Sequence, residues 1–191
     1  MIPSVRQCLE LMDEYRMLAN IRDHSLLVAR VAGLMAENLS RNGVGVSLEL
    51  TVAGALLHDI AKTACLECDG NHAAMGSEIC RRHGYAELAE IVAEHVLLRD
   101  GLAPGCCREK EIVYYADKRV LHDQVVGLDQ RLDYILARYG RDDQRLHRLI
   151  RENFALCHEV EERLFARLPW APAELAGVVA GHTVTLGHET L

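Results

Sequence analysis

An imidazole and a carboxylate stand side by side at His58 and Asp59, at the end of the apolar segment 52–57. Neither group gains from burial unless a polar or charged group receives it, and a metal ion is the usual recipient. Adjacent helical residues point about 100° apart, so this pair alone cannot surround an ion. Other ligands must therefore come from elsewhere in the chain, and the candidates are His24, His72, His95 and Asp117.

Four of these polar residues lie at the edges of apolar runs. His24 precedes such a run, and Asp117 follows the apolar run 112–116. A hydrogen-bonded or capping role explains any one of them taken alone. Taken together, two imidazoles and two carboxylates suit a divalent ion of Mn, Fe, Co, Ni, Zn or Mg and leave positions for water and substrate. Such an ion generates hydroxide near neutral pH and neutralises phosphoryl charge, and phosphate ester hydrolysis needs both.

The elements that position these residues are expected to be helices. Apolar residues recur at helical spacing in nearly every segment, and no segment shows sustained two-residue alternation. Half of the residues are apolar but only 5% are aromatic, which favours helix packing over a sheet. We therefore expect an all-α chain, folded as a single compact helical bundle with a C-terminal helical extension.

Capping and turn residues give the expected helix boundaries. A first helix starts after Ser4, a second runs from about Asn20 to Ser40, and the buried third helix spans 48–61. The later helices are expected at 72–83, 87–98, 109–123, 129–139 and 142–168. The tail after Pro169 carries no clear pattern. His58 and Asp59 should thus lie at the C-terminal end of a helix in the centre of the bundle.

The length of 191 residues fits one domain. Residues 1–140 should form the bundle, and residues 141–191 should form a helix and tail that pack either on it or on a partner subunit. Whether the chain forms a homodimer therefore stays open.

The net charge of −7 argues against binding to duplex nucleic acid but allows a local basic pocket for a small phosphate compound. Charged residues follow Met1 closely, and no apolar run is long enough to span a bilayer, so we expect a cytoplasmic protein without a membrane partner. Seven cysteines without a secretory signal do not indicate a disulfide framework.

The order of His24, then His58 and Asp59, then Asp117 resembles the HD-domain metal-dependent phosphohydrolase superfamily, over about residues 22–119. The resemblance implies an all-helical bundle in which these four residues hold one metal ion.

Two further histidines extend this resemblance. His72, Gly76 and Ile79 are similar to the H-x-x-x-G-x-x-I element of two-metal branches, and His95 falls where those branches place another ligand. Asp59 would then bridge two ions. The alternatives are a helix-start histidine at 72 and a surface histidine at 95.

Four cations are candidates for binding phosphate. Lys62 either complements a helix C-terminus or contacts phosphate. The resemblance favours the second role, because branches acting on dinucleoside polyphosphates, cyclic dinucleotides or guanosine polyphosphates commonly show HD-x-x-K. Arg99, Lys118 and Arg119 either line the mouth of the pocket or form a solvated charged face. The second doublet, His122 and Asp123, is expected to face elsewhere.

We therefore expect a metal-dependent phosphohydrolase acting on a nucleotide or another small phosphorylated compound, with Asp59 and Lys62 as its catalytic residues. Three alternatives remain. The chain could be a catalytically quiet module that binds metal or nucleotide, or it could catalyse the di-iron oxygenase chemistry found in the wider superfamily. It could also hold structural zinc through Cys65, Cys68 and His72, with Cys106 and Cys107 available from a later loop.

Overall fold

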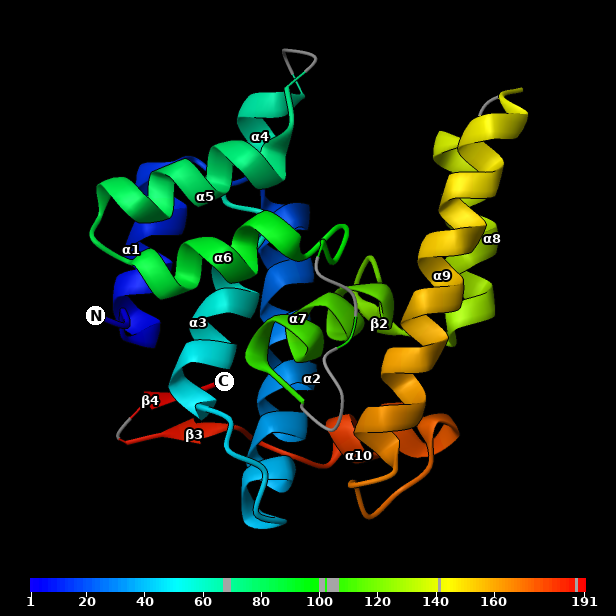
Figure 1. Ribbon diagram of the computed structural model, residues 1–191. Helices are drawn as coiled ribbons and strands as arrows, with labels where there is room; N and C mark the ends of the chain where they lie inside the picture. The colour runs from blue at the N-terminus through cyan, green and yellow to red at the C-terminus, as the bar shows by residue number, and fades with distance from the viewer. Residues whose placement is uncertain (67–69, 100–101, 103–106, 141, 188) are drawn as a thin grey trace.

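The computed structural model describes residues 1–66, 70–99, 102, 107–140, 142–187 and 189–191, and this part of the chain is predominantly helical (Figure 1). The helices are α1 (Val5–Glu14), α2 (Ala19–Arg41), α3 (Leu48–Leu57), α4 (Lys62–Cys65), α5 (His72–Arg82), α6 (Ala86–Glu94), α7 (Glu109–Lys118), α8 (Leu128–Tyr139), α9 (Gln144–Phe165) and α10 (Leu175–Ala180), with a short 3₁₀ turn at Pro172–Glu174. Two antiparallel hairpins pair β1 (Val120–Leu121) with β2 (Gln124–Val125) and β3 (Thr185–Leu186) with β4 (Glu189–Thr190). The all-α prediction is confirmed.

Helix α3 forms the centre of the bundle, in contact with α1, α2, α6 and α7. All its residues from Thr51 to Leu57 are buried, as expected of a helix that is apolar on every side. Ser47 caps its start by accepting a hydrogen bond from the Leu50 amide. The helix is shorter than predicted, because residues 58–61 form tight turns after Leu57. These turns let His58 and Asp59 leave the helix on the same side of the bundle.

The predicted helix over 109–123 is also wrong beyond Lys118. The chain there turns into the hairpin β1–β2, in which Leu121 pairs with Gln124 and His122 and Asp123 form a two-residue loop. His122 has a φ of 56°, and positive φ is what such tight hairpin loops require. The second His–Asp doublet is therefore exposed at the tip of a hairpin.

The C-terminal part of the chain packs on the bundle within the same molecule. Helix α9 contacts α7 and α8, and it buries Phe154, Cys157, Val160 and Leu164. In Figure 1, α8 and α9 stand side by side at the right of the bundle. The tail after Pro169 is more ordered than predicted, since α10 and the β3–β4 hairpin bury Leu175, Val179 and Val184 in the common core.

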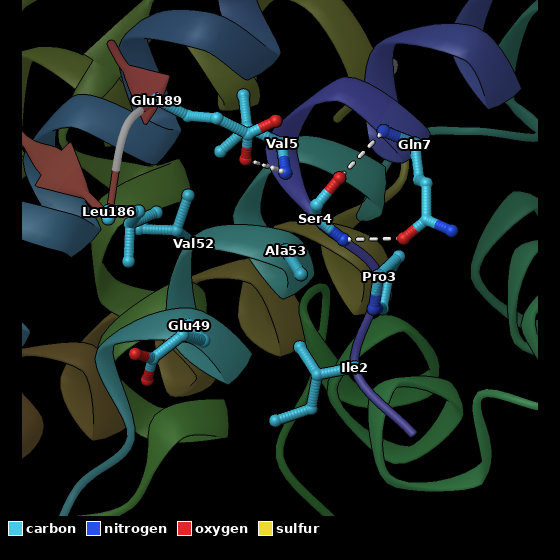
Figure 2. A pocket seen from close by; sticks show the side chains of 11 residues that line it. Ile2, Pro3, Ser4, Val5, Gln7, Glu49, Val52, Ala53, Leu186 and Glu189 are labelled. Atoms are coloured by element: carbon cyan, nitrogen blue, oxygen red, sulfur yellow. Dashed lines mark hydrogen bonds between the residues drawn. The ribbon is translucent and has the colours of Figure 1, made fainter.

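The tail also holds the start of the chain. Both carboxylate oxygens of Glu189 accept hydrogen bonds, from the amides of Val5 (2.9 Å) and Arg6 (3.0 Å), at the N-terminus of α1. Figure 2 shows this contact beside the capping box of Ser4 and Gln7. Within the described residues, no helix is both long and apolar enough to cross a membrane.

Candidate metal centre

The structure brings the six predicted ligands together, although they come from five helical segments. His24 lies on α2, His58 and Asp59 follow α3, His72 begins α5, His95 follows α6, and Asp117 lies in the last turn of α7. They form two ligand groups that share Asp59.

The first ligand group consists of His24, His58, Asp59 and Asp117. The Nε2 atom of His24 lies 3.0 Å from Asp117 Oδ1. His58 Nε2 lies 3.4 Å from Asp59 Oδ2 and 3.7 Å from Asp117 Oδ1. Because ligand atoms of His24, His58 and Asp59 all lie within 4.8 Å of one another, a single ion could contact all three.

The second ligand group consists of Asp59, His72 and His95. Asp59 Oδ1 lies 3.3 Å from His72 Nε2 and 3.5 Å from His95 Nε2, and these two nitrogens are 3.2 Å apart. The two oxygens of Asp59 thus face different ligand groups, which is the arrangement of a bridging carboxylate.

Backbone carbonyls orient two of the imidazoles. His58 Nδ1 donates to the Ala55 carbonyl and His95 Nδ1 donates to the Val92 carbonyl, both at 2.7 Å. These bonds fix the tautomer in which Nε2 carries the lone pair that a metal needs. His58 Nε2 and Asp59 Oδ1 are buried without a hydrogen-bond partner, which costs free energy unless a cation contacts them. The donor set therefore fits a divalent ion in each ligand group.

The charges of the buried groups also suit metal binding. Burial disfavours the ionised form of Asp59, but His58, His95 and Lys62 outweigh it and hold the pKa of Asp59 well below its usual value. Burial lowers the pKa of His72 to about 4, so this imidazole is neutral at pH 7. A charged carboxylate and a neutral imidazole are the forms that ligate metals.

The pKa values of the remaining members of the first ligand group shift in different directions. Burial lowers the pKa of His24. Burial opposes ionisation of Asp117, yet the hydrogen bond from His24 and the charge of Lys118 keep the pKa of Asp117 well below its usual value. For His58, the Asp59 and Asp117 carboxylates outweigh burial and raise the pKa. The two carboxylates thus favour a positive charge at the position of His58 Nε2.

Packing between helices sets the distance between His72 and His95. Gly76 on α5 faces α6, and a Cβ atom there would lie 2.9 Å from Val92 Cγ1. Since this is closer than carbon atoms approach, only glycine allows α5 to lie at this distance from α6. The glycine of the H-x-x-x-G-x-x-I element therefore has a packing role here.

Two predicted substrate-binding cations lie in the pocket beside the ligand groups. Lys62 Nζ is 2.7 Å from Asp59 Oδ2, and its side chain is 34% exposed. Burial lowers the pKa of Lys62, but Asp59 outweighs it and the net shift is upward. Lys118 also lines the pocket, yet it is buried: Nζ donates to the His95 carbonyl at 3.0 Å and lies over the Tyr114 ring.

The other two cations lie elsewhere. Arg119 is buried and donates to the carbonyls of Val126 and Pro172 while pairing with Glu161. Arg99 is exposed and does not line the pocket. Both alternatives are wrong for Arg119, because its guanidinium is buried and paired with Glu161 on α9 and neither lines the pocket nor faces solvent. The exposed Arg99 agrees with the alternative of a solvated charged face.

The pocket beside the ligand groups has a volume of about 420 Å³. Its polar lining consists of Asp59, Lys62, His72, His95, Asp117, Lys118, Arg131 and Asn153. Apolar residues of α8 and α9 line it as well, namely Ile135, Tyr139, Leu146, Ile150 and Phe154, and we call these five residues the α8–α9 wall. The pocket therefore joins a charged end to an apolar one.

Arg131 on α8 is a pocket residue that the sequence analysis missed. Its Nη2 lies 3.8 Å from Asp117 Oδ1, its side chain is only 11% exposed, and its Nε is buried without a hydrogen-bond partner. Arg131 precedes Ile135 and Tyr139 by four and eight residues, so all three share one helix face. The sequence shows this spacing, but it does not show which part of the molecule this helix face contacts.

The predicted cysteine site receives no support within the described residues, since no ligand group there includes a cysteine. Cys65 Sγ lies 3.3 Å from Met75 Sδ, and Cys107 is buried near α9. Cys68 and Cys106 lie outside the described residues. The cavity of Figure 2, about 430 Å³, is lined by the chain start, α3 and the C-terminal hairpin and has no histidine in its lining.

Fold and site together define an all-helical protein whose buried histidines and aspartates could hold divalent metal. The HD domain family matches residues 21–120, and this chain belongs to that family. The match includes every residue of both ligand groups and ends before α8 begins.

Several ribonuclease Y proteins are similar to part of the chain. Ribonuclease Y of Pseudothermotoga lettingae is 37% identical over 98 residues, which are 51% of this chain and 18% of that protein. Ribonuclease Y of Thermosipho melanesiensis is 42% identical over 77 residues, 40% of this chain and 14% of that protein. The chain thus spans less than a fifth of the length of these relatives. A crystal structure described as a predicted HD superfamily hydrolase, from an uncultured Thermotogales bacterium, has a TM-score of 0.47 at 20% identity and covers 86% of this chain and 93% of that one.

Proposed function

We propose that this chain is a metal-dependent phosphohydrolase that cleaves a phosphoester or phosphoanhydride in a nucleotide or another small phosphorylated compound. The observation that carries the proposal is Asp59, whose two buried oxygens face different histidines: His58 lies beside Oδ2, and His72 and His95 lie beside Oδ1. Bound divalent ions supply an activated water and neutralise charge on phosphoryl oxygens.

The chain's own residues place the phosphate at this site. Lys62 has three donors on Nζ, of which Asp59 takes one, and its side chain lies at the pocket surface. Arg131 offers a guanidinium from α8, 3.8 Å from Asp117 Oδ1. A phosphoryl group between these cations would meet the ligand groups on one side and positive charge on the other, as transfer of phosphate requires.

Elemental analysis of the purified protein, followed by a hydrolysis screen, tests this proposal. We expect one or two equivalents of a divalent metal per chain and metal-dependent release of phosphate or nucleotide from at least one nucleotide substrate. A protein loaded with Mn²⁺, Fe²⁺, Co²⁺, Ni²⁺, Zn²⁺ or Mg²⁺ in turn that hydrolyses no nucleotide and no generic phosphodiester would contradict the proposal and favour the quiet binding module.

Because several relatives are named ribonuclease Y, the screen must include a short single-stranded RNA as a substrate. The net charge of −7 and the 420 Å³ pocket favour a small substrate over a long polyanion. We therefore expect faster turnover of free nucleotides than of internal RNA linkages, and cleavage confined to internal RNA positions would contradict the small-substrate part of the proposal.

Two controls separate the alternative chemistries. Hydrolysis that proceeds without oxygen distinguishes a phosphohydrolase from a di-iron oxygenase. Zinc that disappears in Cys65→Ser but persists in His58→Ala would establish the structural zinc site instead, whereas the proposal predicts the reverse pattern.

A further inference from the structure

The α8–α9 wall gives the pocket a second, chemically different end. Ile135, Leu146 and Ile150 are half-buried, Phe154 is buried, and Tyr139 is 49% exposed. Leu146, Ile150 and Phe154 follow one another at intervals of four residues, so they form one stripe along α9. All five residues lie after residue 120, where the match to the HD domain ends. The wall therefore lies outside the part of the chain that matches the HD domain.

Asn153, a polar lining residue on α9, is already engaged in hydrogen bonds. Asn153 Nδ2 donates to the Val96 carbonyl at 3.0 Å, and Asn153 Oδ1 accepts from the Tyr114 hydroxyl at 2.7 Å. The wall thus offers mainly apolar surface and aromatic rings, and Arg131 lies beside it on α8. A ligand that contacts it gains from burial and stacking, not from polar recognition.

Size limits what can occupy the pocket. The same 420 Å³ volume includes Asp59 and Lys62 at its charged end and the α8–α9 wall at its apolar end. This volume lies in the lower part of the range of small-molecule sites, so it suits a small phosphate compound better than a long polymer. A longer substrate would have to extend out of the pocket opening.

We propose that the α8–α9 wall binds an aromatic or apolar organic group of the substrate while its phosphate lies beside Asp59 and Lys62. The inference rests on the proposed function and adds a substrate class to it: small phosphate compounds that carry a ring such as a nucleobase, with weak selection among the bases. Sugar phosphates and inorganic polyphosphates, which cannot use the wall, are poor ligands.

A pair of phosphonates tests the wall without requiring turnover. Phenylphosphonate and methylphosphonate share the charged head and resist hydrolysis, and they differ in the ring. Isothermal titration of the full chain in excess Mn²⁺ should give a Kd for phenylphosphonate at least about tenfold below that for methylphosphonate, because the ring buries apolar area on the wall. Equal Kd values, or binding of neither compound, would overturn the inference.

Substitutions in the α8–α9 wall then test whether the phenyl ring binds there. Ile150→Thr on α9 and Ile135→Thr on α8 should each reduce the phenyl-to-methyl preference several-fold and leave methylphosphonate binding unchanged. Leu149→Thr is the matched control, since Leu149 adjoins Ile150 but is 48% exposed and does not line the pocket. Circular dichroism checks the fold of each variant. A preference that survives in both isoleucine variants would place the ring elsewhere and overturn the inference.

These results distinguish the wall from the proposed function. The phosphonate preference and its loss in the variants, without hydrolysis of any phosphate compound, would support the proposed role of the wall and contradict the enzymatic proposal. Equal kcat/KM for nucleotides and sugar phosphates, together with equal binding of the two phosphonates, would support the enzymatic proposal and contradict the proposed role of the wall.

Discussion

The two ends of the pocket are built in opposite ways. The ligand groups lie on segments of the central bundle, where His58, Asp59 and His95 are at most 2% exposed and backbone carbonyls fix the imidazoles. The α8–α9 wall stands at the edge of the bundle, where Tyr139 is half-exposed and α8 buries only Leu128 fully. One end is rigid and charged, and the other is apolar and open.

We propose that this difference separates the chemistry of the site from its selectivity. Groups that hold an ion must be kept in fixed positions, and burial in a shared core achieves this. A surface that selects the organic part of a substrate needs only shape and apolar area. The family match ends between the two regions, so relatives can share the chemistry and differ in what they bind.

The largest effect should follow from Asp59→Asn, because the amide keeps the shape of the side chain but cannot bridge two cations. We expect metal content and hydrolysis both to fall to background. Inductively coupled plasma mass spectrometry and a phosphate-release assay measure the two losses. Asp123→Asn changes the exposed doublet on the β1–β2 hairpin and should alter neither. Retention of metal and activity in Asp59→Asn would remove the claim of a shared carboxylate.

His72→Gln should separate the two ligand groups. Removing this nitrogen leaves Asp59 and His95 alone in the second ligand group, while the first keeps all its members. We expect the metal content to fall by one equivalent and kcat/KM to fall by more than about 100-fold, beyond the loss typical of a group that only supports a ligand. An unchanged number of bound ions would show that His72 is not a ligand.

Arg131→Gln tests the junction between the two ends of the pocket. A guanidinium that contacts phosphate through charge-assisted bonds contributes about 1.5–3 kcal/mol, so kcat/KM should fall about 10- to 100-fold while metal content stays constant. Arg138→Gln, on the exposed surface of the same helix, should leave kcat/KM unchanged. Equal losses in both variants would indicate a general effect of charge.

The smallest effect is expected from Gly76→Ala, which probes the packing that supports the second ligand group. The added methyl must displace Val92, and such overpacking costs about 1–3 kcal/mol in the free energy of unfolding. Gly177 on α10 has open space around it, so Gly177→Ala should be neutral or stabilise by up to about 1 kcal/mol. Urea unfolding compares the two, and no destabilisation in Gly76→Ala would refute the packing role.

Local patterns in the sequence predicted the central helices, apart from their ends, and the candidate ligands that the structure brings together. The apolar run before His58 predicts a buried helix, and the polar residues at its end predict a shared partner. The HD-type resemblance favoured a ligand role for His72 and His95, which were already candidates. Their convergence on Asp59 needs the packing of α5 on α6, which Gly76 sets and no local pattern specifies.

The errors have a common cause in contacts between distant segments. Arg119 and Arg131 are both arginines near apolar residues, yet Arg119 is held by Glu161 on α9 while Arg131 borders the pocket. Two-residue strands such as β1 and β3 are too short to produce an alternating pattern, so the tail appeared featureless. The pocket residues of α8 and α9 were missed for the same reason, since these two helices meet the candidate ligand groups only in three dimensions.

Anomalous diffraction from a crystal soaked in Mn²⁺ measures the central claim directly. The account predicts two peaks on either side of Asp59, about 3.5–4 Å apart, one beside His24 and His58 and the other beside His72 and His95. No peak near Asp59, or a peak confined to the segment around Cys65, would contradict it.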